Sequence, residues 1–119
     1  MTSWNRALYN NLAGEAAVVA AAVANSATQS AAVDLGRKRL LGIFFPASFE
    51  GTKVTFQAAE TLTGTYVNVL DTDGAAYEAL FTDPGYVPID PLKFVGVQFL
   101  KVTSDVAMTG ANSLNLSVG

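Results

Sequence analysis

From residue 31 onward, the sequence alternates between short runs of β-branched or aromatic residues and pairs of turn-forming residues. We expect strands at 39–45, 54–58, 66–70, 76–80, 86–89, 95–102 and 114–118. Turn pairs such as Glu50-Gly51, Thr63-Gly64, Pro84-Gly85 and Asp90-Pro91 separate them. No helical pattern of useful length interrupts this series. The sequence therefore predicts an all-β fold, an antiparallel β-sandwich or jelly roll with an N-terminal arm.

The composition changes at about residue 30, from Ala- and Asn-rich to Val-, Thr-, Phe- and Gly-rich. We therefore predict an N-terminal arm over residues 1–30 and a β-sandwich domain over residues 31–119. Within the arm, Ser3 is suited to cap a short helix that carries Trp4, Leu8 and Leu12 on one face, and this arm is expected to dock on another subunit. Residues 16–24 fit either a helix or a strand. That run is too short to span a bilayer, which takes about 20 residues, and we expect no membrane association.

The sequence contains neither histidine nor cysteine. The commonest general base, the thiolate nucleophile and the commonest transition-metal ligands are therefore missing. We expect no enzymatic activity, no cofactor and no metal site. The net charge of −3 argues against nucleic acid as the main partner. Only 14% of the residues are charged, so apolar surface is expected to be covered by association with other subunits.

Two acidic segments are candidate sites. The run Asp71-Thr72-Asp73-Gly74 resembles the start of a calcium loop, but Glu78 is misplaced for the closing ligand, and a hairpin turn is favoured. Asp83 and Asp90 could form an acid–base pair, but both lie beside prolines in turn contexts, where aspartate bonds to nearby backbone amides.

Exposed aromatic residues such as Tyr77 and Tyr86 could form a sugar-stacking platform. They could equally be strand residues that pack across the sheet, and this second interpretation is favoured.

The basic triplet Arg37-Lys38-Arg39 directly precedes the most apolar run of the chain. Strand alternation would place Arg37 and Arg39 on one side and Lys38 on the other, after a kink at Gly36. The triplet could be a solvated strand entrance that discourages edge pairing. It could also contact an acidic neighbour, because arginine makes directional bonds to carboxylates.

The order of these features resembles that of small β-sandwich structural proteins from the virions of tailed bacteriophages. The resemblance covers residues 31–119 and is carried by "SAAVDLG", "LLGIFFPASFEGTKVTFQAAE", "TYVNVLDTDG", "YVPIDPLKFVGVQFLKVTS" and "NSLNLSVG". It implies a capsid cement or decoration protein on the virion surface, made in the host cytoplasm. The implied partners are the major capsid protein and further copies of the chain, as a trimer or dimer. The alternatives are a tail, head-fibre or attachment component and a carbohydrate-binding sandwich.

The matching residues are structural, so the resemblance supplies no catalytic or ligand residues. As partner-contact residues we predict Trp4, Leu8, Leu12, Arg37, Lys38 and Arg39. The basic triplet is expected at the base of the domain, where the arm meets the sandwich, facing acidic surface on a capsid protein or a sister subunit.

Overall fold

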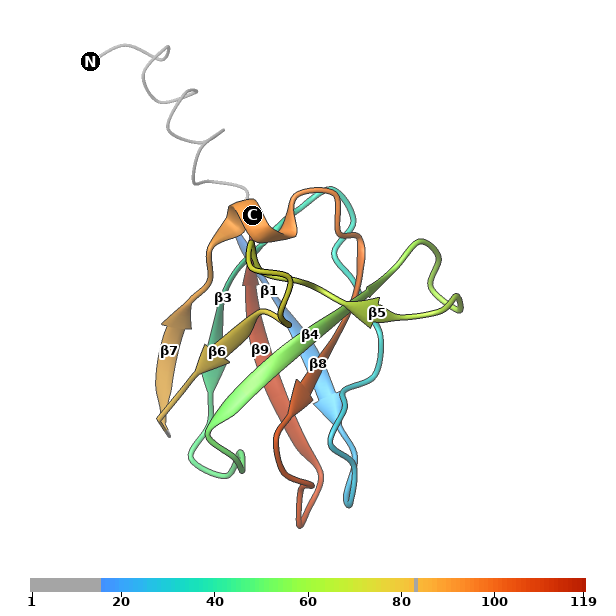
Figure 1. Ribbon diagram of the computed structural model, residues 1–119. Coiled ribbons are helices and arrows are strands. Elements are labelled where there is room, and N and C mark those ends of the chain that lie inside the picture. Colours follow the sequence, from blue (N-terminus) through green and yellow to red (C-terminus); the bar gives the residue numbers. More distant parts are fainter. Residues whose placement is uncertain (1–15, 83) are drawn as a thin grey trace, which may run out of the picture.

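The computed structural model describes residues 16–82 and 84–119, and within them it shows two antiparallel β-sheets packed face to face (Figure 1). The predicted all-β sandwich is confirmed. The strands are β1 (Ala17–Val23), β2 (Val33–Asp34), β3 (Leu40–Phe45), β4 (Lys53–Ala59), β5 (Val67–Asn68), β6 (Glu78–Leu80), β7 (Gly85–Pro88), β8 (Phe99–Ser104) and β9 (Asn112–Val118).

One sheet has four strands in the order β1-β9-β3-β7. Its register is set by long antiparallel pairings, which run from Ala17↔Val118 to Val23↔Asn112 between β1 and β9. On the other side of β9, Phe44 of β3 pairs with Asn115, and Phe44 also pairs with Tyr86 of β7. A register shift between Leu40 and Gly42 marks a β-bulge in β3.

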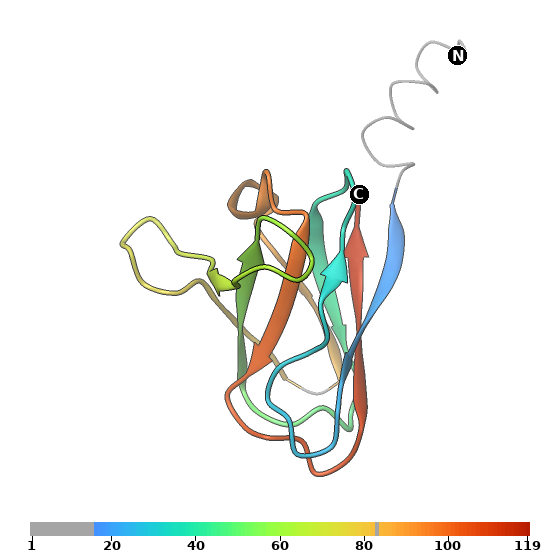
Figure 2. The ribbon, with the colours of Figure 1, turned by 90° about the vertical axis from the view of Figure 1, so that its right-hand side faces the viewer.

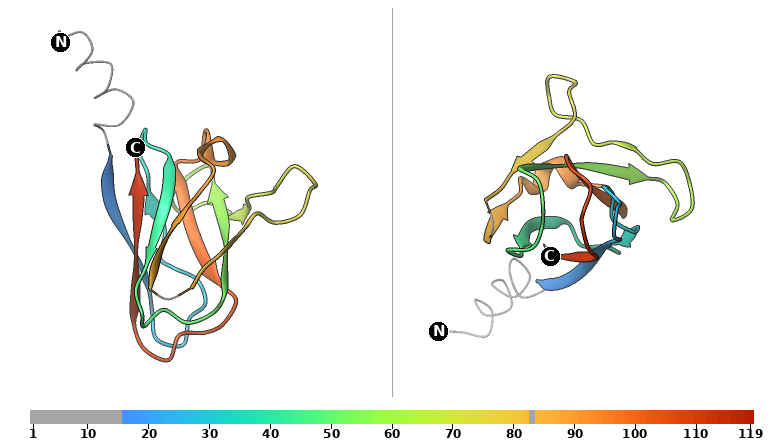
Figure 3. Two further views of the ribbon diagram at one scale, coloured as in Figure 1. Left: turned by 90° about the vertical axis from the view of Figure 1, so that its left-hand side faces the viewer. Right: turned by 90° about the horizontal axis from the view of Figure 1, so that it is seen from below.

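The second sheet is built on the pairing of β4 with β8, and β2 lies beyond β8. Both β5 and β6 pair with β4 and lie one after the other along its free edge. The turn between them, residues 71–75, projects from the body of the sandwich (Figure 2). Seen from below, the two sheets form two layers around one interior (Figure 3).

The interior is filled by the alternate, inward-facing residues of both sheets. Val54 and Phe56 of β4 and Leu114 and Leu116 of β9 are fully buried, as their spacing of two residues requires. Two aromatic groups add to this core. One contains Phe45, Phe49 and Phe81, in which the Phe45 and Phe81 rings stack at 4.0 Å; the other contains Phe56, Tyr77 and Phe94 in tilted and edge-to-face contacts.

The sandwich begins before the predicted boundary at residue 30. β1, which the sequence left open between helix and strand, is a strand of the four-stranded sheet, with Ala21 and Val23 buried. The segment after it is also bound to the sandwich, because Ser30 donates its N–H to Val102 O at 2.8 Å and its Oγ accepts from Val102 N at 3.0 Å. The predicted arm is therefore wrong for residues 17–30. Pairing with β9 decides the structure of this Ala-rich run, over its helical propensity.

A second difference concerns the strand expected at 95–102. Asp90 caps a short 3-10 helix, Pro91–Phe94, and accepts a hydrogen bond from Leu92 N at 3.0 Å. Gly96 then adopts φ +86°, so the chain turns before β8 begins at Phe99. The alternating Val95 and Val97 thus belong to a turn and not to a strand. In the described part of the chain, no helix is long and apolar enough to cross a membrane.

Candidate functional site

The four-stranded sheet contains no charged residue in any of its strands, β1, β3, β7 and β9. Its outward-facing residues form one surface, which we call the uncharged face. This face consists of Val18, Ala20 and Ala22 from β1, Ser113, Asn115 and Ser117 from β9, Gly42 and Phe44 from β3, and Tyr86 and Pro88 from β7. Solvated sheet faces normally carry polar and charged side chains. An uncharged one is typical of an interface core.

The outer surface of the second sheet is different. The strand residues that carry charge in the described chain are Asp34, Lys53, Glu78 and Lys101, and all belong to this sheet. Lys53 and Glu78 form an ion pair at 3.1 Å, while Gln57 accepts from Gln29 and donates to Asn68. The strands of this sheet thus carry charged and polar side chains, beside the exposed Val67 and Leu80. The asymmetry between the two sheets marks the uncharged face as the stronger candidate for binding.

The aromatic side chains Phe44 and Tyr86 form a ridge on the uncharged face. Their ring centroids lie 4.5 Å apart, and each side chain is almost half exposed, at 46% and 44%. Gly42 lies beneath the Tyr86 hydroxyl, where a β-carbon would collide with the ring. The half of the face formed by β1 and β9 carries no aromatic side chain, and Val18 and Asn115 are its largest residues. The face is therefore raised over β3 and β7 and low over β1 and β9.

The basic triplet lies in the turn between β2 and β3 and leads directly into β3, which begins at Leu40. Gly36 adopts φ +63° at the expected kink, and Lys38 N donates to Leu35 O at 3.1 Å to close the turn. Arg37 and Arg39 are exposed, and Lys38 is partly buried. Exposure therefore alternates along the triplet as expected, although Arg37 lies in the turn at Gly36 and not in a strand.

The basic turn lies at the end of the sandwich where the chain enters β1. Arg39 exchanges two backbone hydrogen bonds with Gly119, at 2.8 and 3.0 Å, and Gly119 lies beside Ala16. A hollow of about 220 Å³ separates the turn from residues 96–98. Trp4, Leu8 and Leu12, the other predicted contact residues, lie outside the described residues.

The acidic candidates are turn residues. Asp71 N donates to Ala75 O, and Gly74 adopts φ +85°, as the favoured hairpin turn requires. Lys93 Nζ lies 2.8 Å from Asp71 Oδ1, and this hydrogen bond holds the pKa of Asp71 below its ordinary value and raises the pKa of Lys93. Asp90 caps the 3-10 helix, and Asp83 lies outside the described residues. Within those residues, no group of three or more acidic side chains is arranged to hold a metal ion.

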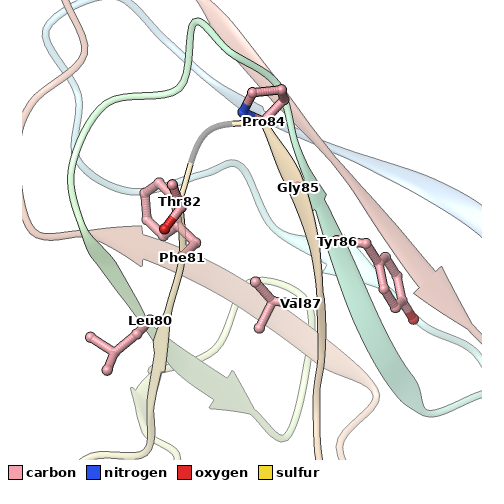
Figure 4. A pocket seen from close by; sticks show the side chains of 7 residues that line it. All are labelled: Leu80, Phe81, Thr82, Pro84, Gly85, Tyr86 and Val87. Atoms are coloured by element: carbon pink, nitrogen blue, oxygen red, sulfur yellow. The ribbon is translucent and has the colours of Figure 1, made fainter.

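Tyr77 and Tyr86 do not form a common platform. Tyr77 packs against Phe56 and Phe94 with centroids 5.9 and 5.8 Å away, whereas Tyr86 belongs to the uncharged face. A cavity of about 360 Å³ lies where the chain crosses from β6 to β7 (Figure 4). The described residues around it, which include Leu80, Phe81 and Val87, carry no charge.

Comparison with known proteins gives one informative likeness. The SPBc2 prophage-derived protein YomS, solved as a crystal structure, superimposes with a TM-score of 0.54 at 16% sequence identity; the match covers 87% of this chain and 95% of that one. At this identity the likeness shows a shared fold. No family model matches the sequence, and no curated protein matches it.

The sequence alone does not identify the uncharged face. The face contains β1, whose run fits either a helix or a strand, and its residues come from runs far apart in the chain. The available signal was that the runs 17–23, 40–45, 85–88 and 112–118 all lack charge. That signal becomes a surface only when the strand order places these runs side by side.

Proposed function

We propose that this chain is a non-enzymatic structural protein of a phage virion, of the capsid cement or decoration type, that binds the major capsid protein and stabilises the shell. The observation that carries the proposal is the likeness of its sandwich to a prophage-derived protein over 87% of the chain. The order of motifs in residues 31–119 supports the same class. Neither cofactor nor nucleic acid has a part in it, and the mature protein resides on the capsid surface after synthesis in the host cytoplasm.

The basic turn supplies the proposed shell contact. Arg37, Lys38 and Arg39 are three of the seven cations of the chain, and they lie together at one end of the sandwich. The other described cations are dispersed over the sandwich: Lys53 pairs with Glu78, Lys93 pairs with Asp71, and Lys101 lies over the ring of Tyr66. Arginine at such a position favours carboxylate partners, because its planar fork can bond both oxygens of a carboxylate.

The proposal is tested by mixing the full chain with empty shells that lack it and measuring bound copies by sedimentation. Saturable binding with increased shell stability is expected. Replacing Arg37, Lys38 and Arg39 with alanine should weaken binding and reduce its salt dependence, because fewer ion pairs form. The matched control replaces Lys53, Lys93 and Lys101 with alanine, which removes the same charge from other places and should leave binding nearly unchanged.

Two results would contradict this function. Equal loss in both triple variants would show that net charge, and not the basic turn, governs binding. No binding of the unaltered chain to any shell would favour the second candidate, a tail, head-fibre or attachment component. A carbohydrate-binding role has less support, since Tyr77 packs against Phe56 and Phe94 and does not join Tyr86 in a common platform.

A further inference from the structure

The uncharged face has two halves of different height: it is raised over β3 and β7 and low over β1 and β9. In the row that crosses the centre of the sheet, Ala20 is followed by Asn115, Phe44 and Tyr86. Ala20 and Asn115 have shorter side chains, whereas Phe44 and Tyr86 form the aromatic ridge. Adjacent strands are about 4.8 Å apart, so the ridge and the low half each occupy about 10 Å of the width of the sheet.

A two-fold axis that runs along the strands, between β9 and β3 and above the face, would bring two such faces together. The rotation exchanges the two sides of the sheet, so β9 lies opposite β3 of the partner and β1 lies opposite β7. Ala20 of each copy then meets Tyr86 of the other, and Asn115 meets Phe44. Each ridge fills the low half of the partner. This reciprocity is what a symmetric, isologous dimer requires of one surface.

We propose that the uncharged face binds a second copy of this chain in this way, as a two-fold, sheet-on-sheet dimer. Charge supports a partner of this kind. The chain carries a net charge of −3, but the strands of the contact contain no charged residue, so no like charges oppose one another across it. Sheets pack face to face about 10 Å apart, which leaves room for the aromatic ridge and the small side chains to interdigitate.

The size of the face sets the strength of the dimer. The four strands contain 24 residues, and an area of about 4.8 Å by 3.3 Å for each residue gives roughly 380 Å² for each copy, or about 760 Å² for both before side-chain relief is added. Specific interfaces begin near 1,000 Å² in total. The dimer should therefore be weak, with a dissociation constant on the order of micromolar. This inference does not depend on shell binding, because the basic turn lies outside the contact.

The test is sedimentation velocity of the full chain from about 1 µM to about 1 mM. The unaltered chain should pass from monomer to dimer over this range. Ala20→Arg places a charge opposite Tyr86 of the partner and should shift the midpoint at least tenfold to higher concentration. The matched control is Val67→Arg, an exposed residue on the edge strand β5 of the other sheet, which should leave the midpoint unchanged.

A second measurement does not depend on a disruptive substitution. Because the chain has no cysteine, Asn115→Cys introduces a single thiol close to the proposed axis, and a short bismaleimide should link two copies rapidly. Thr103→Cys, on the outer surface of the other sheet, should not be linked. If the chain is a monomer at every concentration, the proposal is wrong. Residues 1–15 or a partner of another kind would then be the occupant of the face. A dimer that is insensitive to Ala20→Arg and links through Thr103→Cys also overturns it, since its contact lies elsewhere.

Discussion

The hydroxyl of Tyr86 lies directly over the α-carbon of Gly42, so that any side chain at residue 42 would collide with the tyrosine ring. Gly42 is buried for this reason, although it faces outward in β3. The glycine creates the space in which the Tyr86 ring lies, tilted by 49° against the ring of Phe44. The shape of the aromatic ridge thus depends on a residue with no side chain.

We predict that Gly42→Ala displaces the Tyr86 ring and lowers the free energy of unfolding by about 1–2 kcal/mol, the usual cost of overpacking. In the Tyr86→Ala background, the same change should cost less than about 0.5 kcal/mol, because the collision is gone. Urea unfolding of the four proteins closes this double-mutant cycle. An equal loss in both backgrounds would show that Gly42 is needed for the backbone and not for the tyrosine.

At the end of the sandwich opposite the basic turn, the loop between β3 and β4 and the loop between β8 and β9 bind each other through carboxylates. Glu50 Oε1 accepts hydrogen bonds from Thr109 N at 2.6 Å and Thr109 Oγ1 at 2.8 Å. In return, Asp105 accepts from Thr52 N and Thr52 Oγ1, both at 3.0 Å. The backbone N–H of Thr109 holds the pKa of Glu50 below its ordinary value, and the backbone N–H of Thr52 does the same for Asp105.

These depressed pKa values predict a loss of stability in acid. Each ionised carboxylate stabilises the folded chain fully above its pKa in the unfolded state, and this contribution disappears as the pH falls through the lower folded-state pKa. The urea midpoint should therefore fall between about pH 5 and about pH 2. The double variant Glu50→Gln/Asp105→Asn should start lower at neutral pH and show a shallower decline. Parallel pH profiles for both proteins would show that other groups govern the acid response.

Most strands could be predicted because their signals are local. The runs around Phe44, Phe56 and Leu116 combine β-branched or aromatic residues with an alternation that ends at Gly, Pro or Asn. The predicted and observed bounds of these strands differ by two residues at most. The turn at Asp73-Gly74 was also predictable, because few other residues adopt its backbone conformation readily.

Prediction and structure differ where a strand partner far away in the sequence, or a single glycine, determines the local conformation. β1 could be assigned only with knowledge of β9, because alanine alone favours a helix. The sequence pattern predicts a strand both at the basic triplet and in the segment before β8. In the structure, Gly36 and Gly96 turn the chain there at positive φ. The uncharged face requires the strand order of the sheet, which no local pattern contains.

The turn at Asp71–Gly74 predicts that calcium has no effect on stability. The Asp71 carboxylate already accepts from Lys93 and from Thr72 N, at 2.8 Å each, and the Asp73 carboxylate accepts from Ala75 N at 3.0 Å. The melting temperature should therefore stay within about 1 °C when about 5 mM calcium is added or chelated. A rise of several degrees that Asp71→Asn abolishes would contradict the turn interpretation.

The corrected boundary predicts that residues 17–30 are indispensable for folding. Deleting residues 1–30 removes β1, which pairs with β9 along its full length, and exposes Leu114 and Leu116 at a new sheet edge. It also leaves the buried N–H of Val102 without the Ser30 hydroxyl, a loss of about 1–3 kcal/mol by itself. The deletion also removes the buried side chain of Val23, which lowers the free energy of unfolding further, by about 1.5–3 kcal/mol.

Together these losses consume much of the roughly 5–15 kcal/mol that stabilises an ordinary domain, so the truncated chain should show no cooperative unfolding transition. The matched control lacks residues 1–15 and retains every described strand, and it should unfold cooperatively in urea. Circular dichroism at increasing urea distinguishes the two. If the chain that begins at residue 31 unfolds with the midpoint of the full protein, β1 contributes nothing to the sandwich and residue 30 is its true boundary.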